Sequence, residues 1–556
     1  MTSAKSIDPA ALRMLEIAEG DRLSTAFFRA DEVKPCPIGR GGACCRICYM
    51  GPCRFTGKNA EQMRGVCGAT LSTVAARNLA RAIAGGTAAH SDHGRDLALT
   101  LRAVGRGEAK GYEVRDERKL FTVAKLLGIH TEGKKVLQVA EEVGEKALSA
   151  FGQQEGELPY IKRAPKKRQE LWRKLGLVPR GIDREVVETM HRTHMGVDQD
   201  AEHLLKHALR TSLADGWGGS MLATDITDIL FGTPTPVQSR VNLGVLQEDQ
   251  VNLLVHGHEP LLSEMIVAAA SEPALIEYAK SKGAKGINLA GICCTANEIL
   301  MRQGVPPAGN FLQQELAIAT GVVDAMIVDV QCIMEGLVSV ADQYHTKLIT
   351  TSPKARVDGA THIEFDEHHA LETAREIVKA AIDAFPNRVG KNANIPDITN
   401  ELIAGFSHEY LNYMQGGVYR QSFRPFNEAV IAGRIRGAAG VVGCNNPRCT
   451  HDSAHFQIVR ELIKNDVLVV QTGCSAITSG KFGLLTPEAM ALAGPGLREV
   501  CEAIGVPPVL HMGSCVDNTR ILTVLTQAAT EGGLGEDISD LPAVGIAPEW
   551  MSEKAL

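Results

Sequence analysis

Short runs of aliphatic and β-branched residues recur along this chain, and six of them end in a cysteine or a histidine. Apolar runs of this length, bounded by Gly, Asn or Pro, are typical of buried parallel strands. In an open α/β sheet, ligands bind in the crevice beyond the carboxyl ends of the strands. Thiolates and an imidazole at those ends therefore favour a buried metal–sulfur site over disulfides. The six runs are Val251–His258, Gly286–Cys294, Ala325–Cys332, Gly440–Cys444, Val467–Cys474 and Val509–Cys515.

The order of the periodic segments predicts three domains. Residues 1–236 have mainly helical periodicity, interrupted by a cysteine-rich loop, and the prolines of Thr233–Pro236 end that region. Strands then alternate with helices from 237 to 392 and again from 393 to 556. We therefore predict a multidomain α + α/β protein in which a helical domain precedes two Rossmann-like α/β domains.

Composition and charge exclude several classes of partner. The net charge of −7 gives no reason to expect nucleic acid or an anionic membrane. No apolar run is long enough to span a bilayer, and the amino-terminus lacks the apolar region of a secretory signal, so we expect a cytoplasmic protein. In that compartment, 14 cysteines indicate metal ligation or redox chemistry.

A glycine-rich loop near the amino-terminus holds six of the cysteines. Cys36 and Cys44 cannot complete a four-thiolate site alone, and a symmetric homodimer would supply the second pair across its two-fold axis. The other four match the number that a cubane iron–sulfur cluster requires, although four thiolates also suit a structural zinc ion. These four are Cys45, Cys48, Cys53 and Cys67.

Ten motifs resemble those of the catalytic subunit of anaerobic nickel–iron carbon monoxide dehydrogenases, in the same order over nearly the whole chain. Each is weak alone, but together they are highly specific. The resemblance implies reversible oxidation of CO with water to CO2, two protons and two electrons. The motifs are CCRICYMGPCR (44–54), AHSDH (89–93), VHGHEP (255–260), GICCTANE (291–298), NFLQQELAIATG (310–321), VDVQC (328–332), GCNNP (443–447), QTGCS (471–475), HMGSCVDN (511–518) and APEWMSEKA (547–555).

The resemblance also implies which residues hold the cofactors. Cys36 and Cys44 of both subunits would hold a [4Fe–4S] cluster at the dimer interface, and the four remaining loop cysteines would hold another within each subunit. His256 is a rival for His258 as a ligand, because the motif offers both imidazoles. The ligands implied for a buried Ni-Fe-S cluster of the NiFe4S4 type are His258, Cys294, Cys332, Cys444, Cys474 and Cys515.

Proton and electron transfer are assigned by the same resemblance. Lys554 matches the family lysine that hydrogen-bonds the bound carboxylate, and His90 matches the acid–base histidine. His93 lies three residues further on the predicted helix and would extend a proton relay, which then meets Asp96 and Leu99 and is shorter than in the family. Electrons would leave through the [4Fe–4S] clusters to a ferredoxin-like carrier.

The carboxy-terminus keeps other interpretations open. Family members continue for about half a domain beyond Lys554, whereas this sequence ends at Leu556, so the last α/β domain is expected to be incomplete. The alternatives are a hybrid-cluster protein that acts on hydroxylamine-like substrates and a non-catalytic iron–sulfur relative. Three cysteines have no cluster role in this scheme: Cys293 is expected to pack beside a ligand, Cys501 to be an ordinary buried thiol, and Cys449 has no assigned role.

Overall fold

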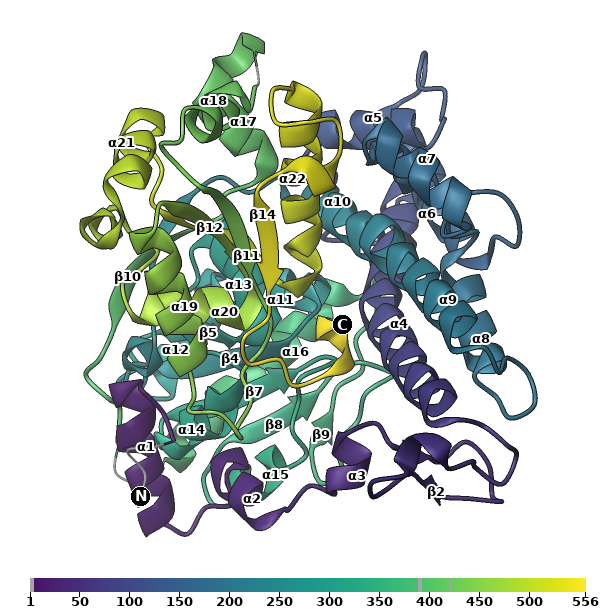
Figure 1. Cartoon of the computed structure of the whole chain (residues 1–556). Coiled ribbons are helices and arrows are strands. Elements are labelled where there is room, and N and C mark those ends of the chain that lie inside the picture. Colours follow the sequence, from purple (N-terminus) through teal and green to yellow (C-terminus); the bar gives the residue numbers. More distant parts are fainter. Residues whose placement is uncertain (1–4, 389–392, 421) are drawn as a thin grey trace.

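The computed structural model describes residues 5–388, 393–420 and 422–556. Its first part is helical, and helices α4 to α10 form the right-hand side of Figure 1. Helices α1 to α3 precede the cysteine-rich loop along the lower edge of the same view. The bounds are α1 (Pro9–Gly20), α2 (Ala26–Glu32), α3 (Pro37–Arg40), α4 (Leu71–Arg106), α5 (Glu117–Leu126), α6 (Val136–Gly152), α7 (Lys166–Leu175), α8 (Ile182–Arg192), α9 (Ala201–Ala214) and α10 (Ser220–Phe231).

Helix α4 is the longest helix of this region, with 36 residues. It begins after Thr70, whose side chain accepts a hydrogen bond from a backbone N–H of the first turn, and it ends at Gly107 in the left-handed conformation (φ 73°). It includes His90 and His93, which the sequence predicts to lie on a helix. The helix continues through Gly86, where a Cβ atom would lie 2.5 Å from the carbonyl oxygen of Glu553. Glycine there weakens the helix but admits the carboxy-terminal segment against it.

The first α/β sheet has six parallel strands in the order β6-β5-β4-β7-β8-β9. Its central strand β4 is buried along its whole length, with Leu253 in the core under α11 and α16 and Leu254 in the core beside α1 and α14. Burial on both faces explains why this strand is a continuous apolar run. The strands are β4 (Val251–Gly257), β5 (Ile287–Ile292), β6 (Pro307–Gly309), β7 (Val323–Val328), β8 (Lys347–Thr350) and β9 (Thr361–His362). The helices are α11 (Pro260–Ala270), α12 (Pro273–Ser281), α13 (Cys293–Gln303), α14 (Gln314–Ala319), α15 (Leu337–Ala341) and α16 (Ala370–Ala384).

The second sheet also has six strands, in the order β14-β11-β12-β13-β10-β3. All pairings are parallel except that of β3 with β10. Strand β3 precedes the first sheet in sequence but belongs to the second, so the predicted boundary at 236 separates it from its sheet. The strands are β3 (Val237–Val241), β10 (Asn400–Ala404), β11 (Gly437–Val441), β12 (Val467–Thr472), β13 (Val509–Gly513) and β14 (Ala543–Ile546). The helices are α17 (His408–Arg420), α18 (Arg424–Ile431), α19 (Ser453–Lys464), α20 (Gly473–Lys481), α21 (Pro495–Ile504) and α22 (Asn518–Glu531).

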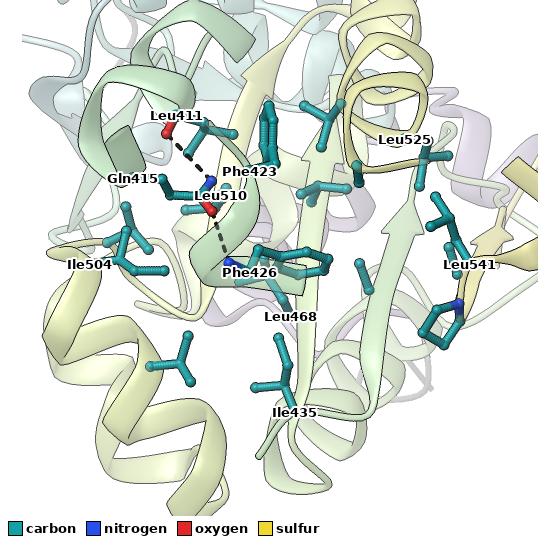
Figure 2. Close-up of a pocket in the computed structure, with 18 of the residues that line it drawn as sticks. Leu411, Gln415, Phe423, Phe426, Ile435, Leu468, Ile504, Leu510, Leu525 and Leu541 are labelled. Carbon is teal, nitrogen blue, oxygen red and sulfur yellow. Dashed lines mark hydrogen bonds between the residues drawn. The ribbon is translucent and has the colours of Figure 1, made fainter. Parts of the chain in front are cut away.

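An apolar cavity of about 60 Å³ lies between the second sheet and helices α17, α18, α21 and α22 (Figure 2). Gln415 is the polar side chain of its lining, and both ends of its amide are hydrogen-bonded, to the backbone of Leu411 and of Phe426. The strand residues that line it, such as Ala438 and Leu510, stand near the amino-terminal ends of β11 and β13. The cavity is therefore set apart from the strand ends that carry cysteines.

The structure confirms a mixed α/β protein with parallel sheets. Each of the six apolar runs forms a strand, and its cysteine or histidine follows the last strand residue by one to four positions. Among the described residues, no helix is long and apolar enough to cross a membrane.

Candidate metal centre

The two sheets place their cysteines in one buried region. His258, Cys294 and Cys515 bring their ligand atoms within 4.8 Å of one another, although β4 and β5 belong to one sheet and β13 to the other. The backbone N–H of Cys515 also donates to the sulfur of Cys294 at 3.3 Å. The convergence that the sequence predicts at strand ends therefore occurs between two sheets rather than along one.

The remaining three predicted ligands join the same group. The thiols of Cys332 and Cys444 interact with each other, and Cys444 also interacts with Cys515. Cys474 accepts a hydrogen bond from the backbone N–H of Phe311 at 3.3 Å. Cys474 also lies close enough to Cys294 to interact with it electrostatically. The five thiols and the imidazole therefore form one cluster.

Backbone conformation at this centre is unusual in ways that favour close approach. Cys293, Gln331 and Cys332 all have left-handed φ angles, of 63°, 62° and 59°. Such conformations are costly for residues other than glycine and cluster at functional sites. Gly473 has a φ of 59°, and a Cβ atom on it would lie 2.8 Å from the sulfur of Cys515.

The two histidines of the VHGHEP motif have different surroundings. The ring of His256 lies on β4 and is hydrogen-bonded through Nε2 to Gln314 at 3.1 Å. His258 directly follows the strand. Its backbone N–H donates a hydrogen bond to the Asp329 carboxylate at 2.7 Å, and its ring lies among the thiols. Burial and the charge of Lys554 lower the pKa of His258 well below its ordinary value, so its imidazole is neutral and able to bind a metal.

Lys554 is the cation of this centre. Its ammonium lies 3.0 Å from the sulfur of Cys332 and 3.3 Å from Nε2 of His258. Burial disfavours the charged form, but the surrounding thiolates outweigh it, with Cys332 first among them, and raise the pKa of Lys554 above its ordinary value. The segment that carries Lys554 packs against α4 at Gly86, where glycine leaves room for its backbone.

His90 faces the centre from α4 and has an acidic partner that the sequence did not reveal. Its ring centroid lies 6.2 Å from that of His258, and its Nδ1 lies 3.7 Å from a carboxylate oxygen of Asp215. Asp215 accepts hydrogen bonds from Ser91 at 3.1 Å and from Ser220 at 2.7 Å. His90, Asp215, Cys515 and Lys554 line one cavity of about 230 Å³.

His93 lies one turn further along α4 and is 3% exposed. Among the described residues, neither of its ring nitrogens has a hydrogen-bond partner. Burial, and then the neighbouring His90, lower the pKa of His93 to about 3, so its ring is neutral. Asp96 on the next turn is paired with Lys354. The ammonium of Lys354 also lies 2.8 Å from the Asp92 carboxylate, and its side chain is partly exposed to solvent.

The amino-terminal loop forms a second cysteine centre. Its four predicted cubane ligands line one small cavity, which Arg77 of α4 also lines. Strands β1 (Cys44–Cys45) and β2 (Cys53–Arg54) pair antiparallel and set Cys45 opposite Cys53. Cys36 is exposed and Cys44 half-buried. Backbone N–H groups of Gly39 and Ile38 lower the pKa of the Cys36 thiol, which favours its thiolate.

The three other cysteines differ in their surroundings. Cys293 is buried, with its sulfur 3.8 Å from that of Cys474. Cys501 is buried on α21 beside the apolar cavity of Figure 2, and burial raises its pKa to about 12, as expected of an ordinary core thiol. Cys449 is exposed in the loop after Cys444.

Known proteins resemble this chain over nearly all of its length. Carbon monoxide dehydrogenase 1 of Methanosarcina mazei is 56% identical over 555 residues, which cover 99% of this chain and 87% of the relative. A nickel-free crystal structure of carbon monoxide dehydrogenase from Thermococcus sp. AM4 superposes with a TM-score of 0.97 at 51% identity, covering 100% of this chain and 87% of that one. A chain of the structure described as NiZn[Fe4S4] and NiNi[Fe4S4] clusters in closed and open alpha subunits of acetyl-CoA synthase/carbon monoxide dehydrogenase gives a TM-score of 0.96 at 44% identity, covering 99% of this chain and 84% of that one.

A family model supports the same relationship independently of any single relative. The model described as Prismane/CO dehydrogenase family matches residues 43–556, which include the buried cluster, Lys554 and every cysteine of the amino-terminal loop except Cys36. The match and the identities above confirm the predicted resemblance. The chain belongs to the Prismane/CO dehydrogenase family.

Proposed function

We propose that this chain is the catalytic subunit of an anaerobic nickel–iron carbon monoxide dehydrogenase, which interconverts CO and water with CO2, two protons and two electrons. One observation carries the proposal: five thiols and one imidazole, each from a different strand end, lie in one cluster beside the half-buried Lys554. The relatives named as carbon monoxide dehydrogenases favour this function over the hybrid-cluster and non-catalytic alternatives.

The donor set fits the cofactor that the family implies. Thiolates suit nickel and iron, and a neutral imidazole completes the set. His258 leaves its Nδ1 without a hydrogen-bond partner among the described residues, as a ligand nitrogen would be before metal binding. The residues proposed to hold a Ni-Fe-S cluster are His258, Cys294, Cys332, Cys444, Cys474 and Cys515.

A bound Ni-Fe-S cluster supplies the two-electron redox chemistry at carbon. The chain supplies charge and proton transfer around it. Lys554 is a fixed cation at the cavity, so it favours negative charge that develops on the oxygens of the substrate. His90, held beside Asp215, takes up and returns the protons of the reaction, and His93 is the next group along α4.

We propose that electrons leave through [4Fe–4S] clusters held by the amino-terminal loop. Cys45, Cys48, Cys53 and Cys67 would hold one within the subunit, since they line one cavity. Cys36 and Cys44 would hold another together with the same pair of a second copy, which implies a homodimer.

The surface of the loop supports such an interface. Tyr49 is fully exposed, and Val33 and Val66 are 61% and 67% exposed in the same segment. A protein–protein contact at this segment would cover these exposed side chains. A ferredoxin-like carrier would accept the electrons. We also propose a cytoplasmic location and a three-domain division at 236 and 392, with β3 as the one strand that joins the sheet of the third domain.

The test is CO-dependent reduction of a viologen dye by the full chain, purified without oxygen and supplied with nickel. Reduction that requires both CO and nickel is expected. If the protein holds its clusters and nickel but reduces no dye with CO, the proposed reaction is wrong. Reduction of hydroxylamine in place of CO oxidation would favour the hybrid-cluster alternative.

A further inference from the structure

A closed ring of buried polar side chains lies directly behind two of the metal-centre thiols. Its members come from α10 in the helical region, from α13 beside the first sheet, and from the turn between β13 and α22 and the first turn of α22 beside the second. Each member is at most 3% exposed. The six side chains are Asp228, Glu298, Arg302, Ser514, Asp517 and Arg520.

Asp228 of α10 joins the two arginines. Arg520 binds its carboxylate in a bidentate manner, with nitrogen–oxygen distances of 2.9 and 2.7 Å. Arg302 donates to the same carboxylate at 2.8 Å. Bidentate arginine–carboxylate pairs fix direction as well as distance, so the two arginines are held at a set angle.

The ring closes through the residues that flank the thiols. Arg520 donates a hydrogen bond through Nε to the Asp517 carboxylate at 2.9 Å. The same carboxylate accepts a hydrogen bond from the backbone N–H of Ser514 at 2.9 Å. The hydroxyl of Ser514 donates to Glu298. Arg302 donates a hydrogen bond to the other oxygen of Glu298 at 2.7 Å. The ring is then closed, because Arg302 also binds Asp228.

The ring is built on the same elements as Cys294 and Cys515. Cys294, Glu298 and Arg302 are spaced by four residues on α13, so they share one face of that helix. Ser514 directly precedes Cys515. The two thiols therefore stand at the ends of two rigid elements that are locked together a few residues behind them.

Each carboxylate of this network is hydrogen-bonded to an arginine. Its three carboxylates face Arg302, Arg520 and Lys119, whose ammonium lies 3.2 Å from Asp228. Burying charges is costly unless they are paired and hydrogen-bonded. An apolar cluster would join these elements at less cost but without fixed directions, so the ring provides geometric definition rather than stability alone.

We propose that this ring sets the separation and orientation of the Cys294 and Cys515 thiols, with Arg520, Arg302 and Ser514 as positioning residues for the metal centre. It joins ligands that come from different sheets, and among the described residues no strand of one sheet pairs with a strand of the other. The inference rests on the proposed function for the identity of the bound group.

The test compares two ring variants with a matched variant elsewhere. Arg520→Lys keeps the charge but loses the bidentate geometry, and Ser514→Ala opens the ring at its uncharged member. Arg388→Lys is the control, because Arg388 makes a similar bidentate pair with buried Asp324 far from the thiols. For each protein, bound nickel and iron, the EPR spectrum of the reduced centre and the midpoint of thermal unfolding are measured.

Both ring variants are expected to lose about tenfold or more in nickel affinity, the range typical of residues that orient metal ligands, and to give an altered EPR spectrum. Arg388→Lys is expected to lower the unfolding midpoint while leaving nickel content and spectrum unchanged. Unchanged metal content and spectrum in folded Ser514→Ala would overturn the proposal, even where Arg520→Lys does not fold. A wild-type protein without the nickel-dependent spectrum would instead refute the proposed function.

Discussion

The ammonium of Lys554 lies 3.0 Å from the sulfur of Cys332, although 222 residues separate them in sequence. The contact sets a positive charge against a thiol whose pKa lies well below its ordinary value, since neighbouring thiols and Lys554 favour its thiolate. A cation so placed can stabilise a metal-centre anion and a substrate oxygen alike.

Replacement of Lys554 by methionine, which has a similar length but no charge, is expected to reduce CO oxidation by about 10²-fold or more, as losing an electrostatic donor does in other active sites. Metal content should change little, because no ligand is removed. The measurement is CO-dependent viologen reduction together with nickel and iron analysis. Lys285→Met, at an exposed surface lysine, is the control and should keep full activity. Equal rates in the two variants would contradict the role of Lys554.

Asp215→Asn tests the acidic partner of His90. The asparagine keeps the hydrogen bonds from Ser91 and Ser220 but removes the negative charge that faces the imidazole. We expect kcat to fall by about tenfold to 10²-fold, within the range attributed to general acid–base groups, with an altered pH–rate profile. Asp183→Asn, at a half-exposed carboxylate on α8, should leave both unchanged. A wild-type pH profile in Asp215→Asn would remove Asp215 from the proton path.

Cys515→Ala is expected to abolish CO oxidation, because it removes one of the three ligand atoms that lie within 4.8 Å of one another. Cys501→Ala provides a close control: it also removes a buried thiol of the second α/β region, but on α21 beside the apolar cavity. Its activity per bound nickel should equal that of the wild type. Turnover at the wild-type rate in Cys515→Ala would show that Cys515 is not a ligand.

The strand ends of both sheets could be predicted from sequence because each apolar run is a local signal. Lys554, His90 and the order of the ligands followed from motifs of contiguous residues. Asp215 could not be found in this way, since it lies in the short turn between α9 and α10 and meets His90 only through tertiary packing. The ring around Asp228 was equally hidden, because its bond to Arg520 spans 292 residues. Strands β3 and β10 pair although all strands of the first sheet lie between them in sequence, so this pairing likewise has no local signature.

Cys36→Ala tests the shared cluster at the loop surface. If Cys36 and Cys44 of two copies hold one [4Fe–4S] cluster, the variant should lose about four iron atoms per dimer, the content of one such cluster. The nickel content and the spectrum of the buried centre should persist, since Cys36 lies outside it. Cys449→Ala, which removes another exposed thiol, should keep all of its iron. An unchanged iron count in Cys36→Ala would refute the placement.

Acid sensitivity follows from the buried neutral histidines, among them His93 with a pKa of about 3. In the unfolded chain its pKa returns to about 6.5. Below pH 6.5 the unfolded state therefore binds a proton that the folded state does not, so the free energy of unfolding falls as the pH falls towards 3. At pH 5 the loss from His93 alone is about 2 kcal/mol, and above pH 6.5 it vanishes.

His93→Gln should therefore unfold in urea with a smaller difference in free energy between pH 8 and pH 5 than the wild type, by about 2 kcal/mol. His451 and His511, both buried with a pKa of about 4, remain in both proteins and cancel in the comparison. His203→Gln, at an exposed histidine, should leave the difference unchanged. If His93→Gln loses as much stability at pH 5 as the wild type, the imidazole is protonated in the folded state, and it then cannot accept a proton from His90 as a neutral relay.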